Sequence, residues 1–417
     1  TKDEHLNEAY VRDIPLEKNK TIRLLRIAML YGANASGKTT VLQALSLLDN
    51  LVTNPLLDSE DEIKANFFAF TTSQEEPSAD LTIKFIRNGK VYRYQLVLAK
   101  SGILCETLEN QTTPPKGTKF ALIYQRCRGD TRSQFQTSYG AGHKLNSAEE
   151  EKLTAELLPN STMLAVLNRK MNIQNPMIKE AYLWFKEQLM GEVTPQTTLT
   201  TWVTKQLTNR NISQDKIIES LNQAGIPVAS LNVVDRQLQG KDLKVLNDAP
   251  TDEVRNQLLD FFSKDKEVHT VYKINGSEFQ LNLKNQESLG TQRYYGLAGL
   301  LSALCSTQNN STPCKILAID EIEHSLHPDL IEHFLVTFLK DSNNSQLIAT
   351  THYRELLNNS LLFRDDVIWF IDKNGEDMSS DLYCLEDVKK DAGLRATSNV
   401  YNFYKHGRLG PVPQLKA

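Results

Sequence analysis

The sequence predicts an α/β fold in which a mixed, largely parallel core sheet is joined to an antiparallel β lobe and an inserted helical subdomain. Three observations support this prediction. A glycine-rich loop follows a buried strand near the start of the chain, Asn-Gly turns separate two pairs of strand-like runs, and helices alternate with apolar strands over residues 287–372. Alternation of strand and helix is typical of a parallel sheet, whereas a tight Asn-Gly hairpin is antiparallel.

Composition limits the class of protein. The 417 residues, 40% apolar and 24% charged, leave room for two or three domains at ~100–200 residues each. A net charge of −4 lacks the basic excess of proteins that bind nucleic acid indiscriminately. The sequence shows neither a membrane span nor a signal peptide, so we expect no membrane association. The odd number of cysteines and their isolated spacing argue against a complete disulfide framework and favour a reducing cytoplasm. The cysteines are Cys105, Cys127, Cys305, Cys314 and Cys384.

The glycine-rich loop spans residues 32–39 and has the pattern G-x-x-x-x-G-K-T, between an expected strand at 22–31 and a helix from 40 to 48. In such a loop, backbone N–H groups turn toward phosphates, Lys38 reaches the β- and γ-phosphates, and the Thr39 hydroxyl can hold Mg²⁺. A glycine-rich loop can be a simple turn, but this spacing after a strand favours binding of a nucleoside triphosphate such as ATP. The expected nucleotide-binding residues here are Gly32, Asn34, Gly37, Lys38, Thr39 and Thr40.

The middle of the chain changes from strands to helices. Strand-like runs at 81–87 and 91–98 meet at Asn88-Gly89, and a second hairpin is expected around Asn275-Gly276. Further expected strands are 104–108, 120–125, 271–274 and 279–283. A capping box at 147–150 opens a helical segment, and its last helix is closed by Gly225. The expected helices are 148–158, 177–190 and 213–224. We therefore expect an N-terminal lobe at 1–145, a helical insert at 146–265 and a C-terminal lobe at 266–417.

Two later strands carry polar side chains at their carboxyl ends. The strand 315–319 ends in Asp320 and Glu321, at the edge where ligands bind in α/β sheets. Asp320 suits Mg²⁺, together with Thr39, and Glu321 can polarise a water for attack on a γ-phosphate. An Asp-Glu pair after a strand is often only solvated surface, but the upstream loop favours the functional interpretation. The strand 346–351 ends in His352, which is either a turn residue or a further group at the same edge.

The order of these motifs resembles the ABC-type ATPases. Ser288 and Gly290, which precede a helix expected at 294–304, resemble the signature loop. Asp320-Glu321 then resembles the Walker B pair and His352 the switch histidine. By itself, S-x-G-x-x-R could simply start a helix; its place before Walker B favours the resemblance. The resemblance implies ATP hydrolysis with Mg²⁺, in which Glu321 and His352 are catalytic and Ser288 and Gly290 contact ATP on the opposite subunit. It thus implies a homodimer or higher oligomer closed through an ATP sandwich.

Within that superfamily the chain resembles the SMC/OLD-like branch. It is most similar to stand-alone AbiL-type AAA ATPases of bacterial anti-phage defence, the PARIS, Septu or RloB-associated kind. The similarity rests on four features, which are D-E-I-E-x-S-L-H-P, T-T-H-x-x-x-L-L, a strand at 366–372 and the segment 407–413. Three features depart from the pattern. A native segment is expected to be missing before Thr1, and His327 stands where SMC-like proteins carry a D-loop aspartate. The Q-loop glutamine is not assigned among the candidates Gln74, Gln125 and Gln174.

The resemblance leaves more than one function open. The first is an ATPase that senses infection and controls a separate nuclease effector of TOPRIM or HNH type; residues after His352 lack the carboxylate pattern of a TOPRIM domain. The alternative is a DNA-repair or chromosome-maintenance ATPase of SMC/RecF type that binds DNA directly. Its candidate basic groups, which are also typical of solvated faces, are Arg126, Arg128 and Arg132, and Lys389, Lys390 and Arg395. A transporter ATPase subunit is disfavoured by the long helical insert.

Overall fold

The protein is represented by a computed structural model. The structure describes residues 8–405 with the exception of residues 18, 57, 71–75, 113–118, 130, 132–133, 172, 237–239, 249–250, 252–253, 256–265, 306–313, 343–344, 360–361 and 392–399. The segment 407–413, Gln74, Arg132 and Arg395, all named above, lie outside this part of the chain.

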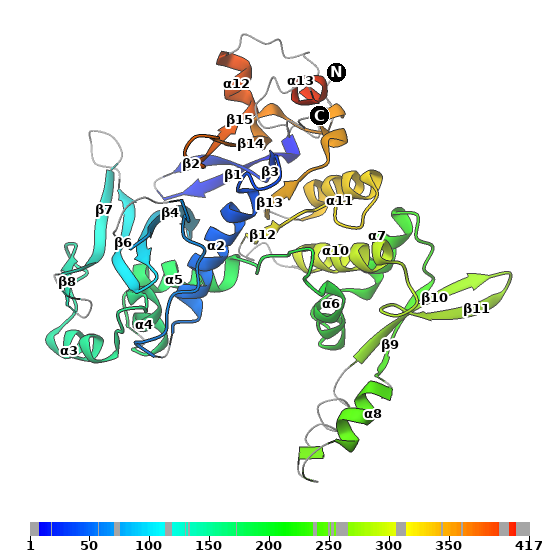
Figure 1. Cartoon of the computed structure of the whole chain (residues 1–417), viewed down its shortest axis with the longest axis horizontal. Coiled ribbons are helices and arrows are strands. Elements are labelled where there is room, and N and C mark those ends of the chain that lie inside the picture. Colours follow the sequence, from blue (N-terminus) through cyan, green and yellow to red (C-terminus); the bar gives the residue numbers. More distant parts are fainter. Residues whose placement is uncertain are drawn as a thin grey trace.

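A mostly parallel sheet forms the centre of the molecule (Figure 1). Its strands, in spatial order, are β12 (Ile316–Ile319), β13 (Gln346–Thr351), β3 (Ile27–Gly32), β14 (Ile368–Lys373) and β15 (Ser380–Cys384). All neighbours are parallel except β15, which runs antiparallel to β14. Side chains of β3 alternate between a large cluster that includes Met29 and a smaller one that includes Leu30. The sheet is therefore buried on both faces, as the alternating helix–strand pattern predicted.

The expected strand 22–31 was wrong as one continuous element. It forms two strands, β2 (Lys20–Leu25) and β3, which are separated at Arg26, and β2 pairs antiparallel with β1 (Val11–Leu16). The buried Arg26 side chain explains the break. Its guanidinium donates to the carbonyls of Leu339 at 2.6 Å and Phe338 at 3.1 Å, near the end of α11 (Pro328–Asp341). Those carbonyls lack partners within the helix, so the arginine caps it.

The antiparallel lobe lies beside the core sheet. Its strand order is β4 (Ser78–Arg87), β5 (Lys90–Ala99), β6 (Gly102–Thr112), β7 (Lys119–Arg128) and β8 (Phe135–Tyr139). Asn88 and Gly89 have φ values of 48° and 73°, so the predicted hairpin is confirmed. Cys105 and Cys127 face each other across β6 and β7 and form a disulfide. Their separation of 22 residues did not indicate this pair.

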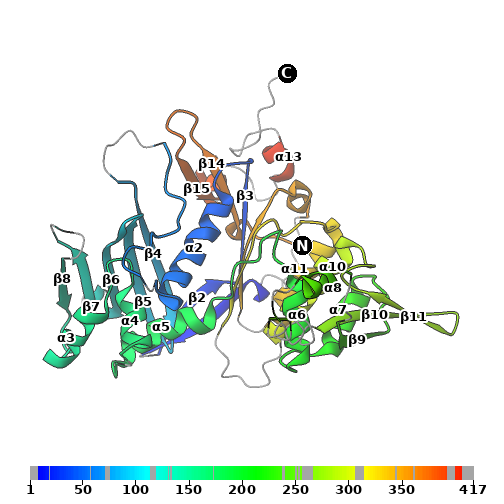
Figure 2. The same ribbon diagram turned by 60° about the horizontal axis from the view of Figure 1, so that its bottom comes forward.

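Helices cover one face of this lobe. The helix α2 (Lys38–Thr53) buries Leu48, Leu51 and Val52 in the lobe's apolar cluster. The same cluster takes side chains from α3 (Ser147–Glu156), α4 (Met163–Arg169) and α5 (Pro176–Gln188). In Figures 1 and 2, α2 lies between the lobe and the core sheet. The capping box of α3 is formed by Asn146 and Glu149, one residue earlier than predicted, because Asn146 is extended and accepts from the Glu149 N–H.

The remaining helices gather on the other side of the core sheet. Close packing of α10 (Leu289–Cys305) on α6 (Leu199–Thr208) depends on glycine: a Cβ at Gly296 would lie 2.5 Å from the Leu199 Cβ. The other elements here are α7 (Gln214–Gln223), α8 (Gly240–Asn247), β9 (Ser230–Asp235), β10 (Lys266–Ile274) and β11 (Ser277–Asn282). The hairpin β10–β11 projects from the body (Figure 1), and its predicted Asn275-Gly276 turn is confirmed. Segment 146–265 thus contributes to both apolar clusters.

The C-terminal part completes the core. It contains the 3₁₀ turns η1 (Arg354–Asn358) and η2 (Asp365–Val367) and the helices α12 (Leu385–Asp391) and α13 (Val400–Lys405). The expected strand 366–372 begins as η2 before it becomes β14. Across the described residues, no helix is long and apolar enough to cross a membrane.

Candidate nucleotide-binding site

The glycine-rich loop joins the end of β3 to the start of α2. A Cβ at Gly32 would lie 2.5 Å from the Ser36 Oγ and 2.6 Å from the Ile371 carbonyl oxygen, so only glycine fits. Gly37, the N-cap of α2, has φ 101°, and Ala35 has φ 61°. Left-handed residues in such a loop turn neighbouring N–H groups inward, and the helix N-terminus adds positive potential. The loop is built to hold an anion.

Lys38 is held inside this loop. Its Nζ donates to the carbonyls of Gly32 at 2.9 Å and Ala33 at 2.8 Å, and the side chain is only 5% exposed. Burial lowers the pKa of Lys38, whereas the negative charges of Glu323, Asp320 and Glu321 act to raise it. The loop thus holds the Lys38 ammonium near three carboxylates.

Thr39 meets Asp320 across the edge of the sheet. The Thr39 hydroxyl donates to the Asp320 carboxylate at 3.0 and 3.1 Å, and Thr350 donates to Oδ1 of the same residue at 2.6 Å. A hydroxyl and a carboxylate are the oxygen donors that suit Mg²⁺. The described residues contain no cluster of three or more His, Cys, Asp or Glu side chains that could hold a metal ion. Thr39 and Asp320 would supply two of the oxygen ligands of an Mg²⁺ ion.

Glu321 and His352 lie at the same edge. Glu321 has φ 48°, and its backbone N–H donates to the Thr350 hydroxyl at 2.8 Å. The His352 backbone N–H donates to Glu323 at 2.5 Å. Burial and the nearby Lys38 lower the pKa of His352, against the effect of Glu323, Glu321 and Asp320. The fold therefore brings the predicted loop, the carboxylate pair and the histidine into one electrostatic neighbourhood.

The predicted signature residues lie elsewhere. Ser288 directly precedes α10, and its hydroxyl accepts from the Thr291 N–H at 3.1 Å. Leu289 is 70% exposed. Within the described residues, no hydrogen bond connects Ser288 or Gly290 with the loop 32–39. Gly290 instead lies against the turn after Glu321, where a Cβ on it would be 3.0 Å from the Ser325 carbonyl oxygen.

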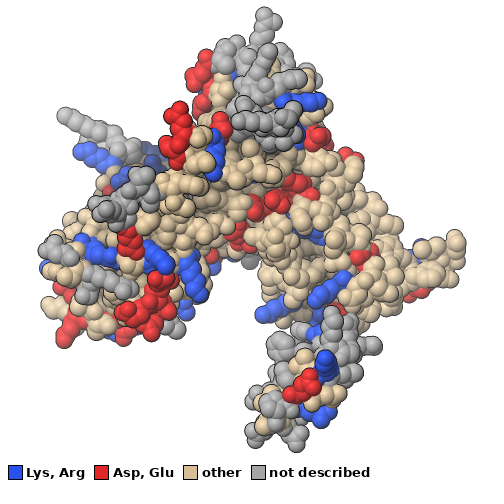
Figure 3. Space-filling view, in the orientation of Figure 1, with Lys and Arg blue, Asp and Glu red and all other residues tan. Residues whose placement is uncertain are grey.

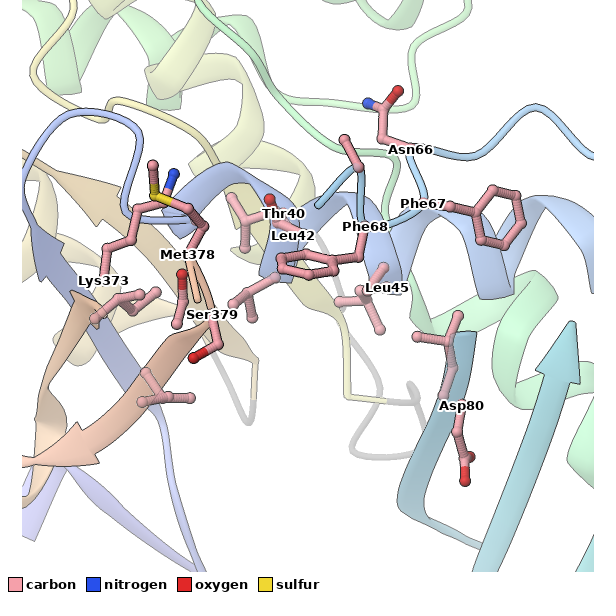
Figure 4. A pocket seen from close by; sticks show the side chains of 18 of the residues that line it. Thr40, Leu42, Leu45, Asn66, Phe67, Phe68, Asp80, Lys373, Met378 and Ser379 are labelled. Atoms are coloured by element: carbon pink, nitrogen blue, oxygen red, sulfur yellow. The ribbon is translucent and has the colours of Figure 1, made fainter. Parts of the chain in front are cut away.

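An apolar groove of about 930 Å³ begins at the loop (Figure 4). Gly37, Thr40 and Val41 are among its lining residues, and the Phe68 side chain lies beside α2. The Lys373 ammonium lies 5.5 Å from the Phe70 ring centre. Sequence analysis did not identify this groove, although the run Phe67-Phe68-Ala69-Phe70 offered a signal. Phe68 and Phe70 are about half exposed, which is unusual for phenylalanine.

A linker at 189–194 was also missed. It adds to the core sheet beside β12, where Val193 exchanges hydrogen bonds with Ala318 and Asp320. Glu192 accepts from the Ser46 hydroxyl of α2 at 3.1 Å, and burial and the charge of Asp320 raise its pKa. Gln125, a candidate for the Q-loop, lies on β7 and donates to Thr107. The glutamate of this linker, and not Gln125, lies near Asp320.

Other expectations about charged residues are corrected by burial. Arg126 is 1% exposed and donates to the carbonyls of Ser161 and Leu158. Lys389 is buried against Asp365 at 2.7 Å. Neither can serve as a free phosphate contact, whereas Lys390 is exposed and pairs with Glu386 at 2.8 Å. His327 is the N-cap of α11, where its ring accepts from the Asp329 N–H.

The fold and the site together define the class of protein. A phosphate-binding loop after β3, carboxylates after β12 and a histidine after β13 make this an α/β P-loop NTPase of the ABC-ATPase type. The chain belongs to the AAA-type ATPase family described as "AAA domain, putative AbiEii toxin, Type IV TA system", whose model matches residues 27–166 and 198–358.

Other comparisons are more distant. No curated protein matches the chain significantly. An Smc head bound to the C-winged helix domain of ScpA is 13% identical, with a TM-score of 0.37 over 91% of this chain and 99% of that one. The SMC head domain from Thermotoga maritima is 12% identical, with a TM-score of 0.30 over 90% and 97%. The recombination mediator RecF with ATP is 13% identical, with a TM-score of 0.28 over 90% and 99%.

Proposed function

We propose that this protein binds and hydrolyses ATP with Mg²⁺. The contact between Thr39 and Asp320 carries the proposal, because it joins the phosphate-binding loop to the end of β12. Both side chains carry oxygens that would hold a Mg²⁺ ion, and the ion would neutralise phosphate charge there. The proposed nucleotide-binding residues remain Gly32, Asn34, Gly37, Lys38, Thr39 and Thr40, with Thr39 and Asp320 toward Mg²⁺.

Each group has a distinct task in hydrolysis. The loop N–H groups and Lys38 bind the phosphates and neutralise charge that develops on them. When bound, Mg²⁺ supplies further neutralisation of that charge. Glu321 accepts a hydrogen bond from the attacking water and so directs it toward phosphorus. His352, whose pKa is lowered by burial and by the nearby Lys38, donates to a γ-phosphate oxygen.

The groove beside the loop suits the nucleobase. Val41, Phe68 and Phe70 line it, and the Lys373 ammonium lies against the Phe70 ring. A purine stacks favourably on an aromatic ring and is shielded from water between apolar side chains. The volume of about 930 Å³ is large enough for a nucleoside. Phe68→Ala should therefore weaken ATP binding without changing its dependence on Mg²⁺.

Two variants test the proposed chemistry. Lys38→Ala should abolish nucleotide binding, because the loop places this ammonium against the phosphates. Glu321→Gln keeps the size of the side chain but weakens the acceptor for water, so ATP should bind and stay unhydrolysed. Binding is measured with a fluorescent ATP analogue and turnover by phosphate release. Micromolar affinity in Lys38→Ala, or normal turnover in Glu321→Gln, would refute the assignment.

We further propose that the ATPase acts in the cytoplasm in bacterial anti-phage defence. This role is the one implied by the resemblance of its motifs to AbiL-type ATPases. In this role an ATP-dependent dimer controls a separate nuclease of TOPRIM or HNH type. The chain belongs to a family whose description names a putative toxin of a toxin–antitoxin system, and this supports a defence role. In a reducing cytoplasm the disulfide between Cys105 and Cys127 would be reduced to two thiols. The test is ATP-dependent co-purification with the product of a neighbouring reading frame. Equal recovery of that product with and without ATP argues against control by nucleotide.

A direct DNA-binding function is the second candidate. Figure 3 shows Lys and Arg side chains on both limbs that flank the hollow, interspersed with Asp and Glu. The Lys and Arg side chains would supply the phosphate contacts of a bound polyanion. The measurement is binding of duplex DNA to the protein alone over a range of salt. Affinity that falls steeply with salt supports this candidate, and no binding at low salt excludes it.

A further inference from the structure

Glu323 lies two residues beyond the proposed catalytic glutamate, in the turn between β12 and α11. The turn is fixed by left-handed residues, Glu321 with φ 48° and Ser325 with φ 61°. Between the two glutamates, Ile322 is fully buried, and its N–H donates to the Thr350 carbonyl at 3.1 Å. Because the turn is anchored in this way, the position of Glu323 is set by the backbone.

The two oxygens of Glu323 have different surroundings. Oε1 accepts the backbone N–H of His352 at 2.5 Å. Oε2 is buried and has no hydrogen-bond partner among the described residues. A buried carboxylate oxygen without a donor is unfavourable by roughly 1–3 kcal/mol. A hydrogen-bond donor that enters the site would therefore bind strongly to this oxygen.

Glu323 also lies toward the phosphate end of the site. Of the carboxylates that act on Lys38, it contributes most, ahead of Asp320 and Glu321, and the same holds for His352. Lys38 marks the place of the β- and γ-phosphates, and His352 marks the γ-phosphate edge. The free oxygen therefore belongs to a side chain that is bonded to the His352 backbone and acts electrostatically on both Lys38 and His352.

We propose that Glu323 is a further positioning residue for hydrolysis: it fixes His352 through the backbone N–H, and its Oε2 accepts a hydrogen bond from the attacking water. The inference rests on the proposed ATPase function. Water has two O–H bonds, and one acceptor fixes only one of them. With Glu321 and Glu323 as two acceptors, the water lone pair is directed at phosphorus.

The chemical step is balanced as follows. The water oxygen forms a bond to the γ-phosphorus, and the bond from that phosphorus to the β–γ bridging oxygen breaks with its electron pair on ADP. Water loses one proton, which passes by way of a carboxylate to solvent or to the released phosphate. No other reactant is needed.

Three variants separate this role from a purely structural one. Glu323→Gln keeps an oxygen for the His352 N–H but replaces the second acceptor by an NH₂ donor. Glu323→Ala removes both. Glu332→Gln is the matched control, because Glu332 on α11 accepts from Asn359 at 3.1 Å and has no contact with the site. Glu321→Gln is measured in parallel.

For Glu323→Gln we expect ATP affinity within about twofold of the parent and kcat reduced ~10-fold or more. Affinity for ADP with aluminium fluoride, which mimics the transferred phosphoryl group, should fall by a similar factor. Glu332→Gln should be normal in all three measurements. Normal kcat and normal ADP–aluminium fluoride binding in Glu323→Gln, with loss only in Glu323→Ala, would show a structural clamp and overturn the inference. If Glu321→Gln also turned over normally, the ATPase assignment itself would fail.

Discussion

Single residues in the site combine side-chain chemistry with unusual backbone conformation. Gly37, Ala35 and Glu321 all have positive φ, and all lie where the chain leaves a strand or enters a helix at the same sheet edge. Such conformations are unfavourable for Ala and Glu and persist where the surrounding structure requires them. Here they turn N–H groups toward an anion and place a carboxylate opposite it.

His352→Ala tests the catalytic role proposed for the His352 imidazole. Its backbone N–H is bonded to Glu323, and the imidazole is the part we expect to contact the γ-phosphate. Removing the imidazole should lower kcat by about tenfold, less than Glu321→Gln does, with ATP affinity nearly unchanged. Phosphate release under saturating ATP measures this. An unchanged kcat would leave His352 with a role in the turn only.

The sequence was sufficient for the residues that motifs place at fixed spacing from a strand end. Lys38, Asp320 and His352 are of this kind, because parallel strands bring their carboxyl ends to one edge. Glu323 and Glu192 were not predictable. The position of Glu323 depends on the left-handed turn at Glu321, and that of Glu192 depends on a linker that pairs with β12 far away in sequence.

Asp49 gives a pH-dependent prediction. Burial raises the pKa of this carboxyl to about 6, and its Oδ1 has no partner among the described residues. The unfolded pKa is about 3.9, so the folded state favours the protonated form. The contribution of Asp49 to the free energy of unfolding is then fully present below pH 4 and is lost as pH rises through 6. Asp49→Asn should raise the free energy of unfolding by ~1 kcal/mol at pH 8, after allowance for partial exposure, and hardly at all at pH 4.

Urea unfolding of Asp49→Asn and the parent at both pH values makes the comparison. The control is Asp80→Asn on β4, which removes an exposed carboxylate. An equal gain at pH 8 and pH 4 would mean that the stabilisation does not come from titration of Asp49.

At the scale of elements, α4 shows how a polar group can be essential inside an apolar lobe. Glu106 of β6 is fully buried and accepts from the backbone N–H groups of Met163 at 2.6 Å and Leu164 at 3.0 Å. Its Oε1 also accepts from the hydroxyls of Tyr94 and Tyr124. The first turn of α4 is therefore capped from a strand, in addition to its N-cap Thr162.

Glu106→Ala should be severely destabilising. It leaves buried N–H and hydroxyl donors without an acceptor, and we expect a loss of about 3–5 kcal/mol in the free energy of unfolding. Glu106→Gln retains one acceptor and should lose less. Urea denaturation gives both values, and a loss below 1 kcal/mol for Glu106→Ala would show that water replaces the carboxylate.

Elements were predictable where periodicity or a turn motif marked them. Both Asn-Gly hairpins and the helices α5 and α7 followed from such signals. The helix α4 was missed because Met163–Leu167 is buried all round and has no amphipathic period. The helix α6 was missed because it is rich in threonine, a weak helix former, and depends on packing against the glycines of α10.

At the scale of the whole molecule, the start of the signature helix α10 lies against the turn after Glu321. Leu289, beside Ser288, is the most exposed of the large apolar side chains in the described residues. A second chain that covered Leu289 would remove this apolar surface from water. We therefore propose a head-to-tail homodimer, or a higher oligomer built from it, in which Ser288 and Gly290 of each chain meet ATP on the other.

The dimer prediction is tested on Glu321→Gln, which should keep ATP bound. With ATP and Mg²⁺, light scattering after size exclusion should show a twofold rise in mass, and without ATP it should not. Adding Ser288→Arg to this variant should block the rise while each chain still binds ATP, because the bulky cation occupies the signature surface. Equal mass with and without ATP would rule out the ATP sandwich.

The helix α2 begins at the phosphate-binding loop and buries its far half in the antiparallel lobe. At 16 residues it is ~24 Å long. A rotation of the helix about the phosphate-binding loop would therefore move its far end the most. A tilt of about 5° at the phosphate end would carry the far end, and the lobe packed on it, through ~2 Å. A displacement of this size is large enough to change which side chains on the outer surface of the lobe contact a partner.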